Sequence, residues 1–137
     1  MIDTIVDLDA TSPLRSPNDI CEAVALLERA GNGNVITAMP ARRSPYFNLI
    51  ELDSAGLVVL SKQPSAAIVR RQDAPNCYDM NASIYAWTQQ SLFASDAVIG
   101  SETRLLIMPE ERSIDIDSEL DFQIVEFLIS RNVGGNA

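Results

Sequence analysis

The first forty residues alternate between strand and helix patterns, and this alternation limits the fold more than any other feature. Residues 4–9, TIVDLD, alternate apolar and acidic side chains as a half-exposed strand does. Ser16 before Pro17 is typical of a helix N-terminus, and GNGN at 31–34 is typical of a helix end. A buried strand, VITAMP, follows at 35–40. This order predicts a βαβ unit with parallel strands and a right-handed crossover.

Later segments extend the predicted sheet and add a hairpin. Two apolar runs, YFNLIEL and GLVVL, flank DSA and Gly56, which predicts a hairpin, and a loop is expected at about 71–80. ASIYAW and RLLIMP are predicted strands with a short helix, TQQSLFAS, between them. Ser118 is predicted to cap a last helix, whose apolar face has helical spacing: Leu120, Ile124, Phe127 and Leu128. We therefore expect one α/β domain over residues 1–137, three-layered and with a largely parallel sheet.

Composition excludes several classes of function. A formal charge of -9 argues against a nucleic-acid partner, because phosphate contacts need clustered basic residues. No apolar run approaches the roughly 20 residues that cross a bilayer, and the first ten residues have no secretory-signal pattern, so a cytoplasmic protein is expected. The two cysteines fit a reducing compartment. Because the chain has no histidine, Ser-His-Asp or Cys-His catalysis is excluded.

The segment SIDIDSELD, at 113–121, carries four carboxylates in nine residues. If it begins as a strand, Asp115 and Asp117 project from one face at the strand's carboxyl end, where α/β sheets bind ligands. Magnesium takes one or two such carboxylates together with water or phosphate. The alternative is that these residues are only the polar edge of a strand followed by a helix cap. The residues alone leave both interpretations open.

Two further segments are candidates for binding an anion. Thr11, Ser12 and Arg15 of TSPLR lie at a predicted strand-to-helix turn, where backbone amides attract negative charge. An ordinary capped turn explains the same residues. RRQD, at 70–73, places two arginines together in an acidic chain and can bind a carboxylate or phosphate, or form only surface ion pairs.

Read together, four segments resemble the acylneuraminate cytidylyltransferases, also called CMP-sialic acid synthetases: LDATSPLR (8–15), SPYFNLIEL (44–52), RRQDAPNCYDMNASIY (70–85) and MPEERSIDIDSELDF (108–122). The resemblance implies a sheet of the nucleotide-diphosphosugar transferase type. It also implies activation of a nine-carbon acidic sugar by CMP transfer from CTP, with Mg²⁺ and release of pyrophosphate. The predicted hairpin, at about 44–75, would be the dimerisation arm of a homodimer.

The resemblance also implies roles for individual residues. In the family, the aspartates of DID bind the metal and approach the sugar, which makes Asp115 and Asp117 the catalytic and metal-binding residues. Arg71 of RQD would contact the sugar or its carboxylate. Asn81 and Tyr85 of NASIY would line the sugar pocket.

The chain also departs from the family pattern. Asp9 stands where many members have a sugar-contacting glutamine, so it is expected to contact the sugar or to bind metal instead. Ala82 replaces a glycine of some sialic-acid enzymes, and the combination favours the bacterial branch acting on legionaminic or pseudaminic-type sugars.

The largest departure concerns the nucleotide site. The A-R-x-G-S-K type of phosphate loop has no counterpart here, and the only lysine is Lys62. The chain is therefore expected to be N-terminally truncated and to cover exposed apolar faces by dimerising or swapping. The alternative to the transferase is a non-catalytic remnant that binds a sugar acid or dimerises.

Overall fold

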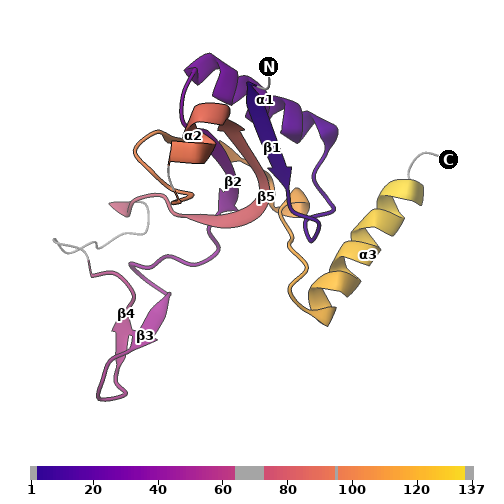
Figure 1. Ribbon diagram of the computed structural model, residues 1–137. Helices are drawn as coiled ribbons and strands as arrows, with labels where there is room; N and C mark the ends of the chain where they lie inside the picture. The colour runs from indigo at the N-terminus through magenta and orange to yellow at the C-terminus, as the bar shows by residue number, and fades with distance from the viewer. Residues whose placement is uncertain (1–2, 64–72, 95, 135–137) are drawn as a thin grey trace. The chain divides into compact units, whose positions relative to one another are not determined.

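The structure is a computed structural model that describes residues 3–63, 73–94 and 96–134 (Figure 1). The chain divides into two compact units, one of residues 1–39 with 80–137 and one of residues 40–79. Among the described residues, no helix is both long and apolar enough to span a bilayer. The helices and strands follow one another along the chain in this order: β1 (Thr4–Leu8), α1 (Pro17–Ala30), β2 (Asn34–Pro40), β3 (Ile50–Leu52), β4 (Val58–Leu60), β5 (Tyr78–Thr88), α2 (Gln89–Ala94), β6 (Thr103–Ile107), the 3₁₀ turn η2 (Glu110–Arg112) and α3 (Glu119–Gly134).

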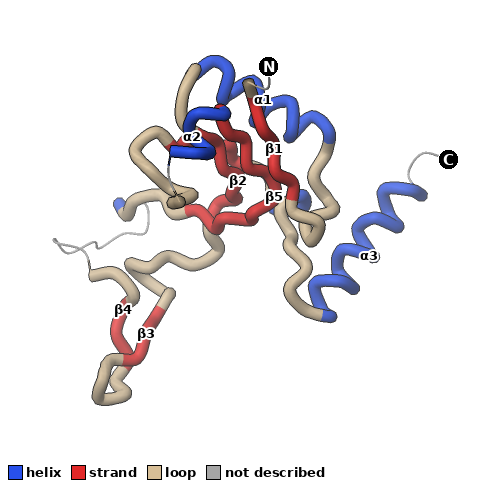
Figure 2. Tube along the Cα trace, in the orientation of Figure 1, coloured by secondary structure: helices blue, strands red, loops and turns tan. Residues whose placement is uncertain are grey.

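The larger unit is built on a four-stranded sheet with the order β1-β5-β2-β6. Figure 2 labels β1, β5 and β2 of this sheet. β2 and β6 are parallel, whereas β1 and β5 are antiparallel. The Thr88 N–H donates to the Gly33 carbonyl and the Ile84 N–H to the Thr37 hydroxyl, so β5 also runs against β2. The expected α/β class is confirmed, but the largely parallel sheet is wrong, because β5 enters between β1 and β2 in the opposite direction. A short apolar run does not reveal its direction, so periodicity alone could not predict this.

Helix α1 follows its sequence signals closely. The Ser16 hydroxyl accepts the Asp19 N–H while the Asp19 carboxylate accepts the Ser16 N–H, which forms a capping box, and Pro17 occupies the first turn. Gly31 ends the helix in the left-handed region. The buried face of α1 packs on the sheet, and the core cluster has these members: Ala23, Leu27, Val35, Ile84, Ala86 and Met108.

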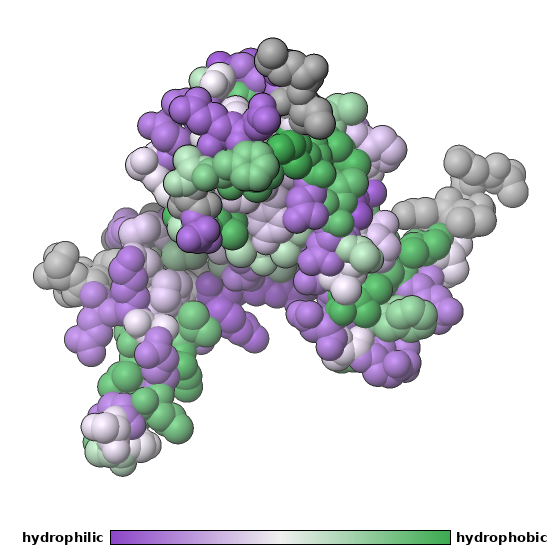
Figure 3. Space-filling model, viewed as in Figure 1, coloured by the Kyte–Doolittle hydropathy of each residue, from purple (hydrophilic) through white to green (hydrophobic). Residues whose placement is uncertain are grey.

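The smaller unit contains the predicted hairpin. β3 and β4 pair antiparallel, and the Asp53 carboxylate accepts the N–H groups of Ala55 and Leu57 at 2.9 Å each, with Gly56 at a φ of 78°. Its apolar side chains are exposed, as Figure 3 shows: Leu49, Ile50, Leu52, Leu57 and Val58. The hairpin is confirmed, whereas its role as a dimerisation arm stays a prediction. The strand after the loop begins earlier than predicted, because β5 already includes residues 78–80.

Helix α3 buries only part of the apolar face predicted for it. Leu120, Ile124 and Phe127 remain 65%, 39% and 58% exposed, whereas Leu128 is half-buried. The buried residue is Val125, at 3% exposure. A hollow of about 450 Å³ separates this side of α3 from the turn after β1, and its lining includes these residues: Ala10, Pro13, Ile116, Phe122, Val125 and Ile129. Phe122, Val125 and Ile129 have helical spacing as well, so the sequence could not decide which side chains of α3 are buried.

The close approach of Gly33 to Glu102 gives the first prediction. Gly33 has a φ of +74°, and an added Cβ would lie 2.2 Å from the Glu102 carbonyl oxygen. Gly33→Ala should therefore lower the free energy of unfolding by about 2–4 kcal/mol, measured by urea denaturation. Gly31→Ala is the matched control, because it has the same φ with nothing within 4 Å, and should lose only about 1 kcal/mol. Equal losses in both variants would contradict the packing argument.

Candidate functional site

The turn after β1 is held by one arginine. Arg15 Nη1 donates to the carbonyl oxygens of Asp9 at 2.6 Å, Ser12 at 2.9 Å and Ser83 at 3.2 Å. The guanidinium thus joins the turn to β5 across the larger unit. This favours the capped-turn interpretation of TSPLR over the anion site, because one Arg15 nitrogen binds three backbone carbonyls and Ser16 caps α1.

Asn81 lies inside the larger unit, next to this turn. It is only 5% exposed, and its amide oxygen accepts the Thr37 hydroxyl at 2.7 Å and the Ser83 N–H at 3.2 Å. Ala82, between Asn81 and Ser83, has a φ of 50°, which only a few per cent of non-glycine residues adopt. The Asn81 side chain therefore fixes the backbone of β5 where it bends. Its predicted role in lining a sugar pocket stays a prediction.

Asp115 lies on an extended loop and not on the predicted strand. β6 ends at Ile107, the 3₁₀ turn η2 follows, and residues 113–117 have no strand partner. One backbone bond, from the Ile116 N–H to the Thr11 carbonyl at 2.9 Å, ties the loop to the turn after β1. A single bond does not make a ladder, which explains why alternating residues here did not form a strand. The alternation itself survives, because Asp115 accepts the Ser12 hydroxyl at 3.3 Å while Ile116 lies in the hollow beside α3.

Asp117 is exposed and does not cap α3. The Ser118 hydroxyl accepts the Asp121 N–H at 3.3 Å and donates to the Asp121 carboxylate at 2.6 Å. This hydroxyl lowers the pKa of Asp121, which also accepts the Asp117 N–H. The predicted cap at Ser118 is therefore confirmed, and it leaves the carboxylates of Asp115 and Asp117 outside the capping interaction.

Tyr85 brings the candidate acidic residues into one neighbourhood. Burial raises the pKa of Tyr85, and the negative charges of Asp9, Asp7 and Asp115 raise it further. Asp7 is directly opposite Tyr85 in the β1–β5 ladder. The Asp9 carboxylate accepts the N–H and the hydroxyl of Thr11 at 3.0 and 2.9 Å, and these bonds lower its pKa. Of the six predicted site residues, the structure thus groups Asp9, Tyr85 and Asp115.

The donor set near Tyr85 fits a hard cation only in part. Within the described ranges, no three carboxylate or thiolate groups are close enough to hold a metal ion together. Asp115 and Asp117 can supply two oxygen ligands, and Mg²⁺ commonly takes its remaining ligands from water and substrate phosphate. Arg71, the predicted sugar-binding arginine, lies outside the described residues.

Sequence reasoning missed the ion pair between Asp19 and Arg112 and the hydroxyl of Ser83. Ser16 and Asp19 have capping-box spacing, so the capping role of Asp19 was readable, but nothing near Arg112 in the sequence identified it as the partner. The Ser83 hydroxyl is buried without a hydrogen-bond partner. A lone serine in an apolar strand carries no signal that would reveal this.

Two relatives match almost the whole chain. It is 54% identical over 127 residues to post-translational flagellin modification protein B of Campylobacter coli, and 52% identical over 128 residues to CMP-N,N'-diacetyllegionaminic acid synthase of Campylobacter jejuni. Each match covers 93% of this chain and 53% of the relative. N-acylneuraminate cytidylyltransferase A of Danio rerio is 28% identical over 134 residues, which are 95% of this chain and 30% of that protein. No protein-family model matches.

One solved structure shows the same fold. The 4-diphosphocytidyl-2C-methyl-D-erythritol synthase of Anaerococcus prevotii has a TM-score of 0.56 and 15% identity, over 95% of this chain and 59% of that one. Over almost its whole length the chain is similar to proteins named CMP-N,N'-diacetyllegionaminic acid synthase and N-acylneuraminate cytidylyltransferase, which confirms the resemblance of its four segments. It spans about half the length of the first two relatives.

The grouping of charges around Tyr85 gives a prediction that needs no ligand. Asp115→Asn removes one of the negative charges that disfavour the phenolate, so the pKa of Tyr85 should fall. Ultraviolet difference absorbance of the phenolate during a pH titration measures this, with Tyr85→Phe assigning the transition. Asp96→Asn, which changes an exposed aspartate that does not act on Tyr85, is the control. If the pKa of Tyr85 were unchanged in Asp115→Asn, Asp115 would not lie close enough to Tyr85 to act on it.

Proposed function

We propose that this chain takes part in activating a nine-carbon acidic sugar, of the legionaminic type, by CMP transfer from CTP with release of pyrophosphate. The observation that carries the proposal is 52% identity, over 93% of the chain, to a protein named CMP-N,N'-diacetyllegionaminic acid synthase. The neighbourhood of Asp9, Tyr85 and Asp115 supports it, because it offers polar groups of the kind that a hydroxyl-rich substrate needs.

In the proposed reaction, the anomeric hydroxyl of the sugar attacks the α-phosphorus of CTP, and the bond to the pyrophosphate oxygen breaks. Such transfers depend mainly on positioning and charge neutralisation, so they need no histidine. The raised pKa of Tyr85 keeps its phenol protonated and able to donate to a sugar oxygen. The Asp9 carboxylate is ionised at neutral pH, as an aspartate ordinarily is, and bonds from Thr11 lower its pKa further. It accepts from a sugar hydroxyl.

Asp115 and Asp117 are the residues proposed to hold Mg²⁺. Their carboxylate oxygens suit this cation, which would neutralise the charge that builds up on the phosphate oxygens. Asp115 is fixed by the Ser12 hydroxyl, whereas Asp117 is exposed and can adjust to a ligand. We further propose that Arg71 binds the sugar carboxylate and that the β3–β4 hairpin dimerises through its exposed apolar side chains, in a cytoplasmic enzyme.

A second candidate function is favoured by the exposed apolar side chains of the β3–β4 hairpin, which a binding or dimerisation module would cover. A chain that binds the sugar acid but not CTP would be a non-catalytic sugar-binding or dimerisation module.

Calorimetry on the chain separates the two candidates. The transferase predicts Mg²⁺-dependent binding of CTP as well as binding of N,N'-diacetyllegionaminic acid, and Asp115→Asn should weaken the Mg²⁺-dependent part by at least about tenfold. Asp96→Asn changes an exposed aspartate that is not among the charges acting on Tyr85, and this variant should bind like the unchanged chain.

Each other outcome has a distinct meaning. Sugar binding without CTP binding would support the module and contradict the transferase. Binding of neither ligand would contradict the transferase and the sugar-binding module, and would leave only the dimerisation role.

A further inference from the structure

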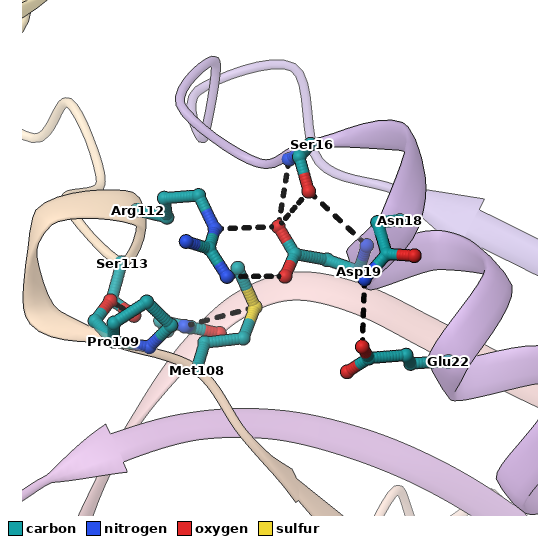
Figure 4. Close-up of polar contacts among 9 residues, drawn as sticks. Ser16, Asn18, Asp19, Glu22, Met108, Pro109, Arg112 and Ser113 are labelled. Atoms are coloured by element: carbon teal, nitrogen blue, oxygen red, sulfur yellow. Dashed lines mark hydrogen bonds and ion pairs between the residues drawn. The ribbon is translucent and has the colours of Figure 1, made fainter.

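The Asp19 carboxylate accepts four hydrogen bonds, and it lies outside the proposed substrate contacts. Its side chain is 3% exposed. Arg112 donates to it twice, from Nε and from Nη2, at 2.9 Å each. The Ser16 N–H and hydroxyl donate at 2.7 and 2.8 Å. Figure 4 shows Arg112 reaching from the turn after β6 to this carboxylate at the start of α1.

This ion pair joins two segments that are far apart in the sequence. Asp19 is fixed by the capping box of α1, while Arg112 ends η2, three residues before Asp115. The η2 turn is itself closed by the Arg112 N–H and the Ser113 hydroxyl, which donate to the Pro109 carbonyl at 3.1 and 2.8 Å. A displacement of Arg112 would therefore move the chain that enters the Asp115 loop.

The loop that carries Asp115 is anchored on both sides to the same part of the molecule. Before Asp115, Arg112 binds the first turn of α1. After it, the Ile116 N–H donates to the Thr11 carbonyl at 2.9 Å. Thr11 lies in the segment that joins β1 to α1, and Asp19 lies in the first turn of α1. Asp115 thus lies between two contacts to neighbouring parts of the chain.

The chemistry of the Asp19–Arg112 ion pair suits a role in fixing the position of the neighbouring loop. A guanidinium binding a carboxylate through two parallel bonds fixes both distance and orientation, which the single ammonium of a lysine does not. Burial would raise the pKa of Asp19, but the hydrogen bonds from Arg112 and Ser16 outweigh it and lower the pKa. The carboxylate is therefore ionised, and the pair stays charged, through the neutral pH range.

We infer that Asp19 and Arg112 act as positioning residues that hold the 113–117 loop against the β1–α1 turn and so set where Asp115 stands beside Tyr85. The inference rests on the proposed function for the meaning of that placement, because Asp115 is there a Mg²⁺ ligand. Neither Asp19 nor Arg112 touches substrate or metal in this account. Their effect passes through the loop.

The test replaces Arg112 by lysine, which keeps the positive charge but lacks the two parallel N–H donors of the guanidinium. In Arg112→Lys, hydrogen exchange of the Ile116 amide should become at least about tenfold faster, because the loop opens locally. The Gly31 amide, which donates to the Leu27 carbonyl at the other end of α1, should keep its exchange rate. Arg104→Lys is the matched control, since Arg104 binds Asn32 and Glu102 and should leave both amides unchanged.

A second readout follows Asp115 itself. In Arg112→Lys the pKa of Tyr85 should fall, as is predicted for Asp115→Asn. Mn²⁺, used as the probe ion, should bind more weakly. Asp19→Asn, which removes the charge and one acceptor, should reproduce both effects. If only this variant fails to fold, Arg112→Lys still decides.

Two results would overturn the inference. One is an unchanged Ile116 exchange rate in a folded Arg112→Lys variant. The other is equal acceleration of the Ile116 and Gly31 amides, which would make the pair a contributor to global stability only. If the unchanged chain binds no Mn²⁺, the proposed function fails, while the exchange measurement still decides the positioning role.

Discussion

The site depends on the buried residue Asn81, which links the strands β2 and β5 to the turn after β1. Its side-chain oxygen accepts from Thr37 on β2 and from the backbone of Ser83 on β5, and its backbone carbonyl accepts the Ser12 hydroxyl from the turn after β1. A buried amide left without such partners would cost roughly 1–3 kcal/mol for each unmade bond. The network therefore stabilises one arrangement of β5, in which Ala82 keeps its positive φ and Tyr85 faces the acidic turn.

Two arginines connect neighbouring segments to this network, each through a different kind of acceptor. Arg15 binds neutral backbone carbonyls and joins the turn after β1 to β5, whereas Arg112 binds the buried Asp19 carboxylate and joins the first turn of α1 to the segment before Asp115. In a chain with a net charge of -9, both guanidinium groups are used to hold segments of the fold together.

The sequence predicted those elements whose signals are local. The cap at Ser16, the left-handed end at Gly31 and the turn at Gly56 each follow from residue chemistry over a few positions. The strand expected at 113–117 did not form, because alternation creates a strand only where a neighbouring edge is available. The direction of β5 and the buried face of α3 depend on contacts between distant segments, which local patterns do not encode.

The same distinction applies to the site. Asp9, Tyr85 and Asp115 were predicted through a family resemblance, and the fold brings them together. Spacing did not predict that Asn81 would be enclosed, because a polar residue in a strand looks alike whether its amide faces a ligand or the core. The Asp19–Arg112 pair joins residues 93 positions apart, and one sequence gives no indication of such a contact.

The central claim is tested most directly by single-turnover release of pyrophosphate from CTP and Mg²⁺ by this chain. The assay compares N,N'-diacetyllegionaminic, pseudaminic and N-acetylneuraminic acids as the acceptor. Our account predicts release with at least one of these sugars, highest with the legionaminic acid, and none when the sugar or Mg²⁺ is omitted. No release with any of the three sugars would contradict the transferase reaction for this chain.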